Sequence, residues 1–288
     1  MMVIEKLNNK NSKYFNLLLK EAEEKSKYRV DFYKNYDNKT FVYKYFLRKL
    51  VSLVKFNDKY IGYIWIDIPS NKTVQIQDMY IQEEYIQYLN EKTLLIFKSD
   101  IVLYEGLEDL NLLTLVRTFK MNRIRLTYLM KLNNEKVTTK RLSDARFIPL
   151  IKNKDEELRC KIQNDIFKED TRTPLTLEDI KYDEKQEYYI DDLCVFIKVK
   201  NTIIGYGQII FSRGIYSVVN FGIIDKFRSK GYGEDLIIKL IDLAREKGIK
   251  DLYIRVDNNN IPAKKLYRSV GFEEVGQFST WLWAKELI

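Results

Sequence analysis

The chain has 288 residues and a formal net charge of +8, with 45% hydrophobic and 31% charged residues, two cysteines and no histidine. This length can bury two cores, and the composition is typical of globular proteins. The lack of histidine excludes His-based triads, and two cysteines with no C-x-x-C spacing make a zinc site unexpected, so we predict no metal. Without an apolar signal region or a stretch of roughly 18 apolar residues, the sequence predicts a cytoplasmic protein that does not contact membranes.

The positive charge comes mainly from lysines that alternate with Asp and Glu along the chain. Such a surface attracts anions, either a phosphorylated cofactor or a nucleic acid. Nucleic-acid binders usually concentrate their basic residues in one run or patch, and this sequence has no such run. The pattern therefore favours a small anionic ligand over a nucleic acid.

A weak internal repeat suggests two domains of similar plan. KFNDKYIGYIWI (55–66) and KVKNTIIGYGQI (198–209) align with Ile-Gly-Tyr in register, and each predicts a hairpin. A further strand candidate follows each hairpin, at 73–82 and 215–224. The polar stretch 131–145 lacks apolar periodicity and is the expected linker.

In chain order, the first half is expected to end on a helix and a pair of strands within 114–132. The predicted strands of the second half span 146–150, 193–199, 203–211, 217–224, 251–256, 272–275 and 278–283. The predicted helices span 155–167, a short segment after the cap Thr176, 231–247 and 260–270. Helices and strands alternate, which indicates an α/β or α+β fold.

The glycines point to the second half as the site. Only Gly62 and Gly106 lie in the first half, and the other nine lie between Gly205 and Gly276. Glycine is needed where the backbone takes a positive φ or approaches a ligand closely. We therefore expect the ligand site in the second half.

The segment RSKGYG, from Arg228 to Gly233, joins a predicted strand to a predicted helix. In that arrangement, free backbone N–H groups and the helix dipole both favour an anion. A Walker loop is absent, and Leu236 stands where a dinucleotide fingerprint requires its third glycine. The turn alone is equally compatible with an ordinary strand–helix connection.

A second pattern follows one strand later. Asn260, Ala263 and Tyr267 are spaced i, i+3 and i+7, which places an amide, a small residue and a phenol along one helix face. An extended amide-containing ligand would fit that face. An N-cap Asn and a half-buried Tyr would give the same pattern without a ligand.

Together the two segments resemble the GNAT superfamily of acetyl-CoA-dependent N-acetyltransferases. Its signature Q/R-x-x-G-x-G/A matches Arg228 to Gly233, and its later signature N-x-x-A-x-x-x-Y-x-x-x-G-F matches Asn260 to Phe272. The resemblance covers residues 146–288 and reaches the first half only through the hairpin pattern and element order. It implies two GNAT-like domains, each a mixed, mostly antiparallel twisted sheet flanked by helices.

The resemblance also implies the positions that contact acetyl-CoA. The preceding strand would pair with the pantetheine arm, and an N–H near Ile223 would bind the thioester carbonyl. Asn260 would contact the pantetheine, and Ala263 leaves room for it. The full set implied for the cofactor is Phe221, Gly222, Ile223, Arg228, Ser229, Lys230, Gly231, Tyr232, Gly233, Glu234, Asn260 and Ala263.

The implied reaction is transfer of an acetyl group to a primary amine in a ternary complex, with Tyr267 as the general acid for the leaving thiolate. Family members often carry a Glu on the strand before the glycine turn, whereas IYSVVNFGII has no acid. The base stays open between a water chain and the side chains of Tyr206, Glu187, Asp191 and Asp192. The acceptor is equally open among small-molecule and peptide amines, and a homodimer is compatible with the sequence.

The first half departs from the family pattern. EEYIQYLNEK has two acids and no glycine where phosphates would sit, and Val116 and Leu112 stand at the places of Tyr267 and Ala263. We therefore predict a degenerate GNAT-like domain at 1–143 and an N-acetyltransferase domain at 144–288. A CoA-binding regulatory module without transfer activity is the main alternative, and a basic nucleic-acid binder is the third.

Overall fold

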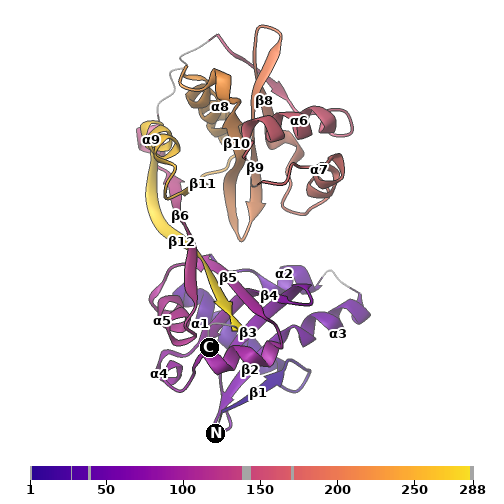
Figure 1. Cartoon of the computed structure of the whole chain (residues 1–288), viewed down its shortest axis with the longest axis vertical. Helices are drawn as coiled ribbons and strands as arrows, with labels where there is room; N and C mark the ends of the chain where they lie inside the picture. Colours follow the sequence, from indigo (N-terminus) through magenta and orange to yellow (C-terminus); the bar gives the residue numbers. More distant parts are fainter. Residues whose placement is uncertain (1, 27, 38–39, 138–143, 170–171, 286–288) are drawn as a thin grey trace. The chain divides into compact units, whose positions relative to one another are not determined.

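The computed structural model describes residues 2–26, 28–37, 40–137, 144–169 and 172–285 (Figure 1). The chain forms two compact units. Unit 1 comprises Met1–Thr127 and Gly276–Ile288, and unit 2 comprises Tyr128–Val275. Each unit contains a mixed, mostly antiparallel sheet with helices packed on it, so the predicted α/β class is confirmed.

Unit 1 has the strand order β1-β2-β3-β4-β5-β12-β6, in which β4 and β5 are parallel. Two buried clusters lie on its sheet, one with α1 and the other with α5. Its elements are β1 (Met2–Lys6), α1 (Ser12–Lys25), α2 (Phe32–Asp37), α3 (Phe41–Lys49), β2 (Val51–Phe56), β3 (Lys59–Ser70), β4 (Thr73–Ile81), α4 (Glu83–Ile86), the 3-10 helix η1 (Glu91–Phe97), β5 (Ile101–Leu107), α5 (Leu110–Thr118) and β6 (Asn122–Leu132).

Unit 2 has the strand order β12-β6-β11-β10-β9-β8-β7, in which β10 and β11 are parallel. One buried cluster joins α8 and α9 to the sheet, and another joins α6 to it. Its elements are η2 (Asn134–Lys136), β7 (Arg146–Pro149), α6 (Glu156–Ile166), α7 (Leu177–Asp183), η3 (Asp191–Leu193), β8 (Cys194–Val199), β9 (Thr202–Ser212), β10 (Ile215–Ile223), η4 (Asp225–Phe227), α8 (Tyr232–Glu246), β11 (Leu252–Asp257), α9 (Ile261–Ser269) and β12 (Phe272–Ala284).

The last strand differs from its prediction. β12 runs unbroken from Phe272 to Ala284, whereas two strands, 272–275 and 278–283, were predicted. A Cβ on Gly276 would lie 2.7 Å from Leu107 Cδ1, so this glycine allows β12 to approach β5 and does not make a turn. From Phe278 onward β12 pairs antiparallel with β5.

The unit limits therefore differ from the predicted domains 1–143 and 144–288. The end of β12 completes unit 1, and unit 2 begins at Tyr128, inside β6. The first half likewise ends on the single strand β6, where a pair was predicted. Of the predicted linker 131–145, residues 138–143 lie outside the described residues.

The predicted hairpin repeat is confirmed. β2 and β3 form one hairpin with Val54 opposite Gly62, and β8 and β9 form the other with Ile197 opposite Gly205. In both, the register shifts at the residue after Val54 or Ile197. The second strand of each hairpin also pairs with the strand that follows it: Gly62 with Ile81 of β4, and Gly205 with Ile223 of β10. Ile223 is therefore the counterpart of Ile81, and adding 142 to a residue number in β4 gives its counterpart in the sequence of β10.

The helix α8 forms from a strongly amphipathic segment. Its buried face includes Leu236 and the predicted residues Ile237, Leu240, Ile241 and Ala244. A Cβ on Gly207 of β9 would lie 2.7 Å from Leu240 Cδ1, so the absent side chain lets α8 lie close to the sheet. Gly248, with a φ of 71°, follows the helix and allows the chain to leave it.

We predict that Gly62→Ala and Gly205→Ala each lower the free energy of unfolding by about 1–3 kcal/mol, the usual cost of overpacking. The added methyl would lie 2.3 Å from the Tyr80 carbonyl oxygen in the first case and 2.6 Å from the Gly222 carbonyl oxygen in the second. Backbone atoms cannot move aside as a side-chain end can. Urea unfolding measures the effect, and the exposed Glu246→Ala is the control. A loss below about 0.5 kcal/mol in both glycine variants would contradict this account.

Candidate cofactor cleft

The central feature of unit 2 is a fork between β10 and β11. These parallel strands pair only from Tyr216 opposite Leu252 to Val218 opposite Ile254. On its other side, β10 stays paired with β9 as far as Ile223. The last part of β10 therefore has one hydrogen-bonding edge without a strand partner, and an extended amide ligand could pair there.

The N–H of Ile223 lies on this open edge. The next residue, Ile224, donates its N–H to the Ile204 carbonyl of β9 at 2.8 Å. Because successive N–H groups of a strand point to opposite edges, the Ile223 N–H points away from β9. A backbone donor thus lies where the thioester carbonyl was expected.

The glycine turn leads into the amino-terminal end of α8. Gly231 is the N-cap with a φ of 83°, and Ser229 also has a positive φ, of 59°. Since glycine has no side chain to cap the helix, the first N–H groups of α8 keep their capacity to bind an anion. Ser229 and Lys230 are exposed and Tyr232 packs on the core, so the polar side of the turn faces solvent.

Gly233 has a packing role. A Cβ at this position would lie 3.3 Å from Leu266 Cδ2 of α9 and 3.9 Å from Ile223 Cγ1. The missing side chain therefore brings the start of α8 close to both α9 and the end of β10. Glu234 follows in the first turn and is half-buried.

Arg228 binds backbone carbonyls. Its Nε donates to the Ile223 carbonyl at 2.9 Å, and Nη2 donates to the Ile166 carbonyl at 2.8 Å. Nη1 pairs with Asp225 at 3.1 Å. All three guanidinium nitrogens are engaged, so Arg228 ties the end of α6 to the end of β10 and is not aimed at a phosphate in this structure.

The second motif starts with a helix cap. Asn260 is the N-cap of α9, and its Oδ1 accepts the Ala263 N–H at 3.1 Å. Asn260 is exposed and Ala263 half-buried. The cap accounts for the oxygen of the Asn260 amide, and its NH2 group remains a donor for a ligand at this end of the cleft.

Tyr267 joins the two motifs. It is 6% exposed, and its ring makes an edge contact with the Phe221 ring at a centroid distance of 5.9 Å. This contact places the phenol beside the unpaired part of β10. Burial raises the pKa of Tyr267 above its usual value of 10.0, so the phenol keeps its proton at neutral pH.

The side chains considered for the base have other surroundings. Tyr206 is fully buried and donates to Gln208 Oε1 at 2.6 Å. Asp191 pairs with Lys152, and Asp192 pairs with Lys247 just past the last turn of α8. The 15 residues of α8 span about 22 Å, so Asp192 lies far from Gly231. Glu187 is exposed.

The corresponding part of unit 1 lacks the long helix. Gln82 donates its N–H to the Ile61 carbonyl at 2.8 Å, as Ile224 does to Ile204 in unit 2. The chain then forms only the four-residue α4 and the 3-10 helix η1 before β5. Unit 1 therefore does not place a long helix amino terminus at the end of β4.

Side chains of unit 1 also fill the end of its sheet. β4 and β5 pair only from Thr73 to Ile76, which leaves a fork like that of unit 2. Asn111 of α5, which is 4% exposed, donates its Nδ2 to the Ile81 carbonyl at 2.7 Å. Ile81 is the counterpart of Ile223, whose carbonyl accepts Arg228 Nε, so this carbonyl is engaged in both units and in unit 1 its donor comes from α5.

A buried ion pair closes the same region. Arg29 Nη1 donates to Asp78 Oδ1 at 2.8 Å and to the Met79 carbonyl at 3.0 Å, and its Nε donates to the Ala22 carbonyl. Tyr63 donates to the other oxygen of Asp78 at 2.5 Å. Sequence inspection missed this group, because Arg29 and Asp78 are 49 residues apart and belong to no motif.

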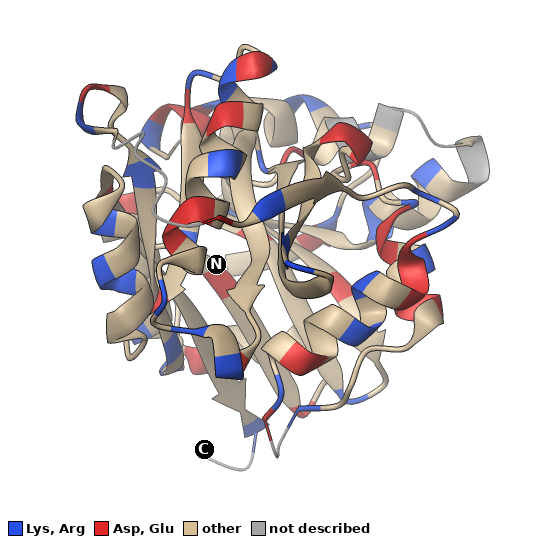
Figure 2. Ribbon diagram, turned by 90° about the horizontal axis from the view of Figure 1, so that it is seen from above, with Lys and Arg blue, Asp and Glu red and all other residues tan. Residues whose placement is uncertain are grey.

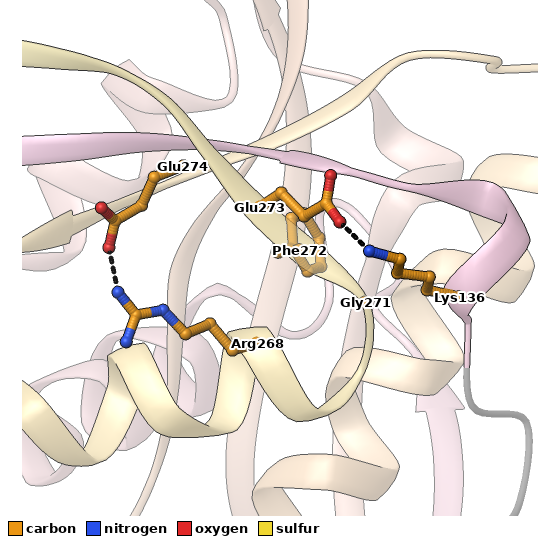
Figure 3. Close-up of a pocket in the computed structure, with 6 residues that line it drawn as sticks. All are labelled: Lys136, Arg268, Gly271, Phe272, Glu273 and Glu274. Carbon is orange, nitrogen blue, oxygen red and sulfur yellow. Dashed lines mark hydrogen bonds and ion pairs between the residues drawn. The ribbon is translucent and has the colours of Figure 1, made fainter.

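A pocket of about 370 Å3 in unit 2 lies at the end of the second motif, where Gly271 and Phe272 form part of its lining (Figure 3). Its charged side chains pair with each other: Lys136 with Glu273 and Arg268 with Glu274, both at 2.6 Å. Each cation is thus neutralised beside the pocket. We assign the pocket no part in cofactor binding.

Charge and other features add little. Lys and Arg are interspersed with Asp and Glu along the described helices (Figure 2). Within the described residues, no helix is long and apolar enough to cross a membrane. Over the same part of the chain, no three Cys, Asp or Glu side chains gather as a metal site.

Comparison with known proteins agrees with the geometry. Residues 161–272 match the acetyltransferase (GNAT) family, and this region contains both motifs. The N-acetyltransferase YycN of Bacillus subtilis, which carries the description uncharacterized, is 37% identical over 57 residues. That match covers 20% of this chain and 36% of YycN, so the similarity spans about a third of the relative's length.

Two solved structures cover nearly the whole chain. A GCN5-related N-acetyltransferase from Sphaerobacter thermophilus aligns with a TM-score of 0.74 at 13% identity, covering 98% of this chain and 95% of that one. A tandem GNAT protein from the clavulanic acid biosynthesis pathway aligns with a TM-score of 0.65 at 9% identity, over 99% and 98%. The chain has the GNAT fold, and its residues 161–272 match the GNAT acetyltransferase family.

We predict that Arg29→Met lowers the free energy of unfolding by about 3–5 kcal/mol, because it leaves the Asp78 carboxylate buried without its cation. The control Lys25→Met removes the exposed pair with Glu83 and should cost less than about 1 kcal/mol. Urea unfolding compares the two. Equal losses would show that the Arg29–Asp78 pair contributes no more than a surface pair.

Proposed function

We propose that this protein is an acetyl-CoA-dependent N-acetyltransferase with one active site, in unit 2. The observation that carries the proposal is the Phe221–Tyr267 ring contact, because it joins the open edge of β10 to a buried, protonated phenol. The matched GNAT region includes both elements. Donor, acceptor and acid then meet at one end of the fork.

The cofactor would bind along the open edge. The pyrophosphate would accept N–H groups at the start of α8, where Gly231 takes a positive φ. The pantetheine amides would pair with β10 beyond Val218, where β11 no longer does. The thioester carbonyl would accept the Ile223 N–H, which stabilises the oxyanion of the tetrahedral intermediate.

In the reaction, the lone pair of a neutral amine attacks the thioester carbon and forms the N–C bond. The C–S bond then breaks, and Tyr267 gives its proton to the departing sulfur so that CoA leaves as a thiol. The amine loses one proton to solvent water, and Tyr267 regains one from solvent. Burial of the phenol suits this role, because it keeps the acid protonated until the thiolate forms.

Unit 1 would not bind the cofactor. Asn111 donates to the Ile81 carbonyl, and Arg29 donates to Asp78 and to the Met79 carbonyl. Side chains of unit 1 itself therefore bind the end of β4. We propose that unit 1 has kept the fold and lost the cofactor site; β6 and β12 connect it to unit 2 along the chain.

Acetyl-CoA should raise the melting temperature of the wild-type protein. At a hundredfold excess over Kd, one-site binding adds about 2.7 kcal/mol, which is several degrees for a chain of this size. Gly231→Glu should abolish the shift, because it adds a carboxylate at the phosphate position and a Cβ at a positive φ. Gly248→Glu, also at a positive φ but in open space, is the control that keeps the shift. No shift in the wild type at millimolar acetyl-CoA would refute the proposal.

Tyr267→Phe should keep the acetyl-CoA shift and lower kcat on the order of 10²-fold, since it removes the acid and keeps the ring. A CoA-release assay over several classes of amine measures turnover. Because burial raises the pKa of Tyr267, the acid form is lost only as pH rises above 10.0, so wild-type kcat should not fall between neutrality and that pH. Unchanged turnover in Tyr267→Phe would remove Tyr267 from this role. Binding without CoA release from any amine would instead favour a regulatory CoA-binding module.

A further inference from the structure

Asn220 is the least regular residue of β10. It has a φ of 50°, in the left-handed region, although it lies inside a strand. The pairing of β10 with β9 is interrupted between Val219, opposite Gln208, and Gly222, opposite Tyr206, so a β-bulge surrounds Asn220. Strained residues and bulges inside strands often lie beside active sites, where they redirect a side chain.

The bulge coincides with the start of the fork. Pairing of β10 with β11 ends at Val218, two residues before Asn220. The next residue after Asn220 is Phe221, whose ring contacts Tyr267. Adjacent Cα atoms are about 3.8 Å apart. Asn220 therefore lies at the closed end of the cleft, three residues before Ile223, whose N–H would bind the thioester carbonyl.

The carboxamide of Asn220 is available to a ligand. Asn220 is half-buried, and its carboxamide has no hydrogen-bond partner among the residues that the structure describes. Nor does its carboxamide belong to the buried unpaired atoms found in that part of the chain, so solvent reaches it.

Unit 1 offers an internal comparison. Counted back from Ile81 and Ile223, Asp78 corresponds in sequence to Asn220, whereas the bulge in β10 places Val219 opposite Gln208, the counterpart of the Trp65 that faces Asp78. Asp78 is buried and holds Arg29 and Tyr63. In unit 2 the counterpart of Tyr63 is bonded to Gln208 instead, which leaves Asn220 free of that contact. The Asp78 carboxylate of unit 1 thus has two internal partners, whereas the Asn220 carboxamide has none among the described residues of unit 2.

We propose that Asn220 is a positioning residue for the acceptor amine: its carboxamide oxygen accepts an N–H of the amine and directs the lone pair to the thioester carbon. This inference rests on the proposed function. A neutral acceptor suits the task, because a carboxylate there would stabilise the ammonium form, which cannot attack. It also fits β10 itself, which carries no acid.

The test distinguishes the effect of the Asn220 carboxamide from the effect of the backbone conformation at the bulge. Asn220→Gly keeps the positive φ at little cost and removes the side chain, whereas Asn220→Ala also strains the backbone. The matched control is Asn153→Gly, an exposed loop residue of unit 2 with a φ of 65°. Steady-state CoA release gives kcat and KM for the amine and for acetyl-CoA, and a melting shift reports cofactor binding.

We expect Asn220→Gly to lower kcat/KM for the amine about tenfold, the worth of one neutral hydrogen bond. The KM for acetyl-CoA and the melting shift should stay at the wild-type values, and Asn153→Gly should match the wild type throughout. Wild-type turnover in Asn220→Gly would overturn the proposal, because only the backbone conformation would then matter. Loss of the acetyl-CoA shift in Asn220→Gly would also overturn it. A wild-type protein that releases no CoA would instead refute the proposed function.

Discussion

The structure of unit 2 depends on one constraint: β10 and β11 pair for three residues and then separate. β11 pairs with β10 at Tyr216, Ser217 and Val218, after which the bulge at Asn220 turns the backbone out of register. Other contacts maintain the separation. Arg228 holds the end of β10 to α6, and the Phe221 ring of β10 contacts the Tyr267 ring of α9. The backbone groups on this edge that no strand pairs with can be satisfied by water or by an extended ligand.

The two units share one arrangement of strands but differ in the side chains and helices that follow it. Both contain the hairpin with a glycine opposite the end of the next strand, and both have short parallel pairing beyond it. Unit 2 follows its strand with a glycine turn and a 15-residue helix. Unit 1 follows its strand with acids and short helices and fills the fork with Asn111 and Arg29. A few side chains thus decide whether the frame can take a ligand.

Much of this fold could be predicted from the sequence, because local signals were strong. The hairpin repeat, the amphipathic face of α8 and the capping Thr176 of α7 all occur as predicted. Other features depend on contacts between distant residues. From the sequence, Gly276 predicts a break in β12, whereas in the structure this glycine makes room for the Leu107 side chain. The Arg29–Asp78 pair likewise joins residues that no sequence pattern connects. Asn220 did leave a signal: an Asn within IYSVVNFGI is rare in strands and tolerates a positive φ.

The central claim is that one fork per chain, the one in unit 2, takes the cofactor. Hydrogen exchange with and without saturating acetyl-CoA tests it most directly, because it reports backbone N–H groups along the chain. We expect slower exchange at residues 221–224 and 229–234 and no change at residues 78–97. Slower exchange at residues 78–97, or none at residues 221–234, would contradict it.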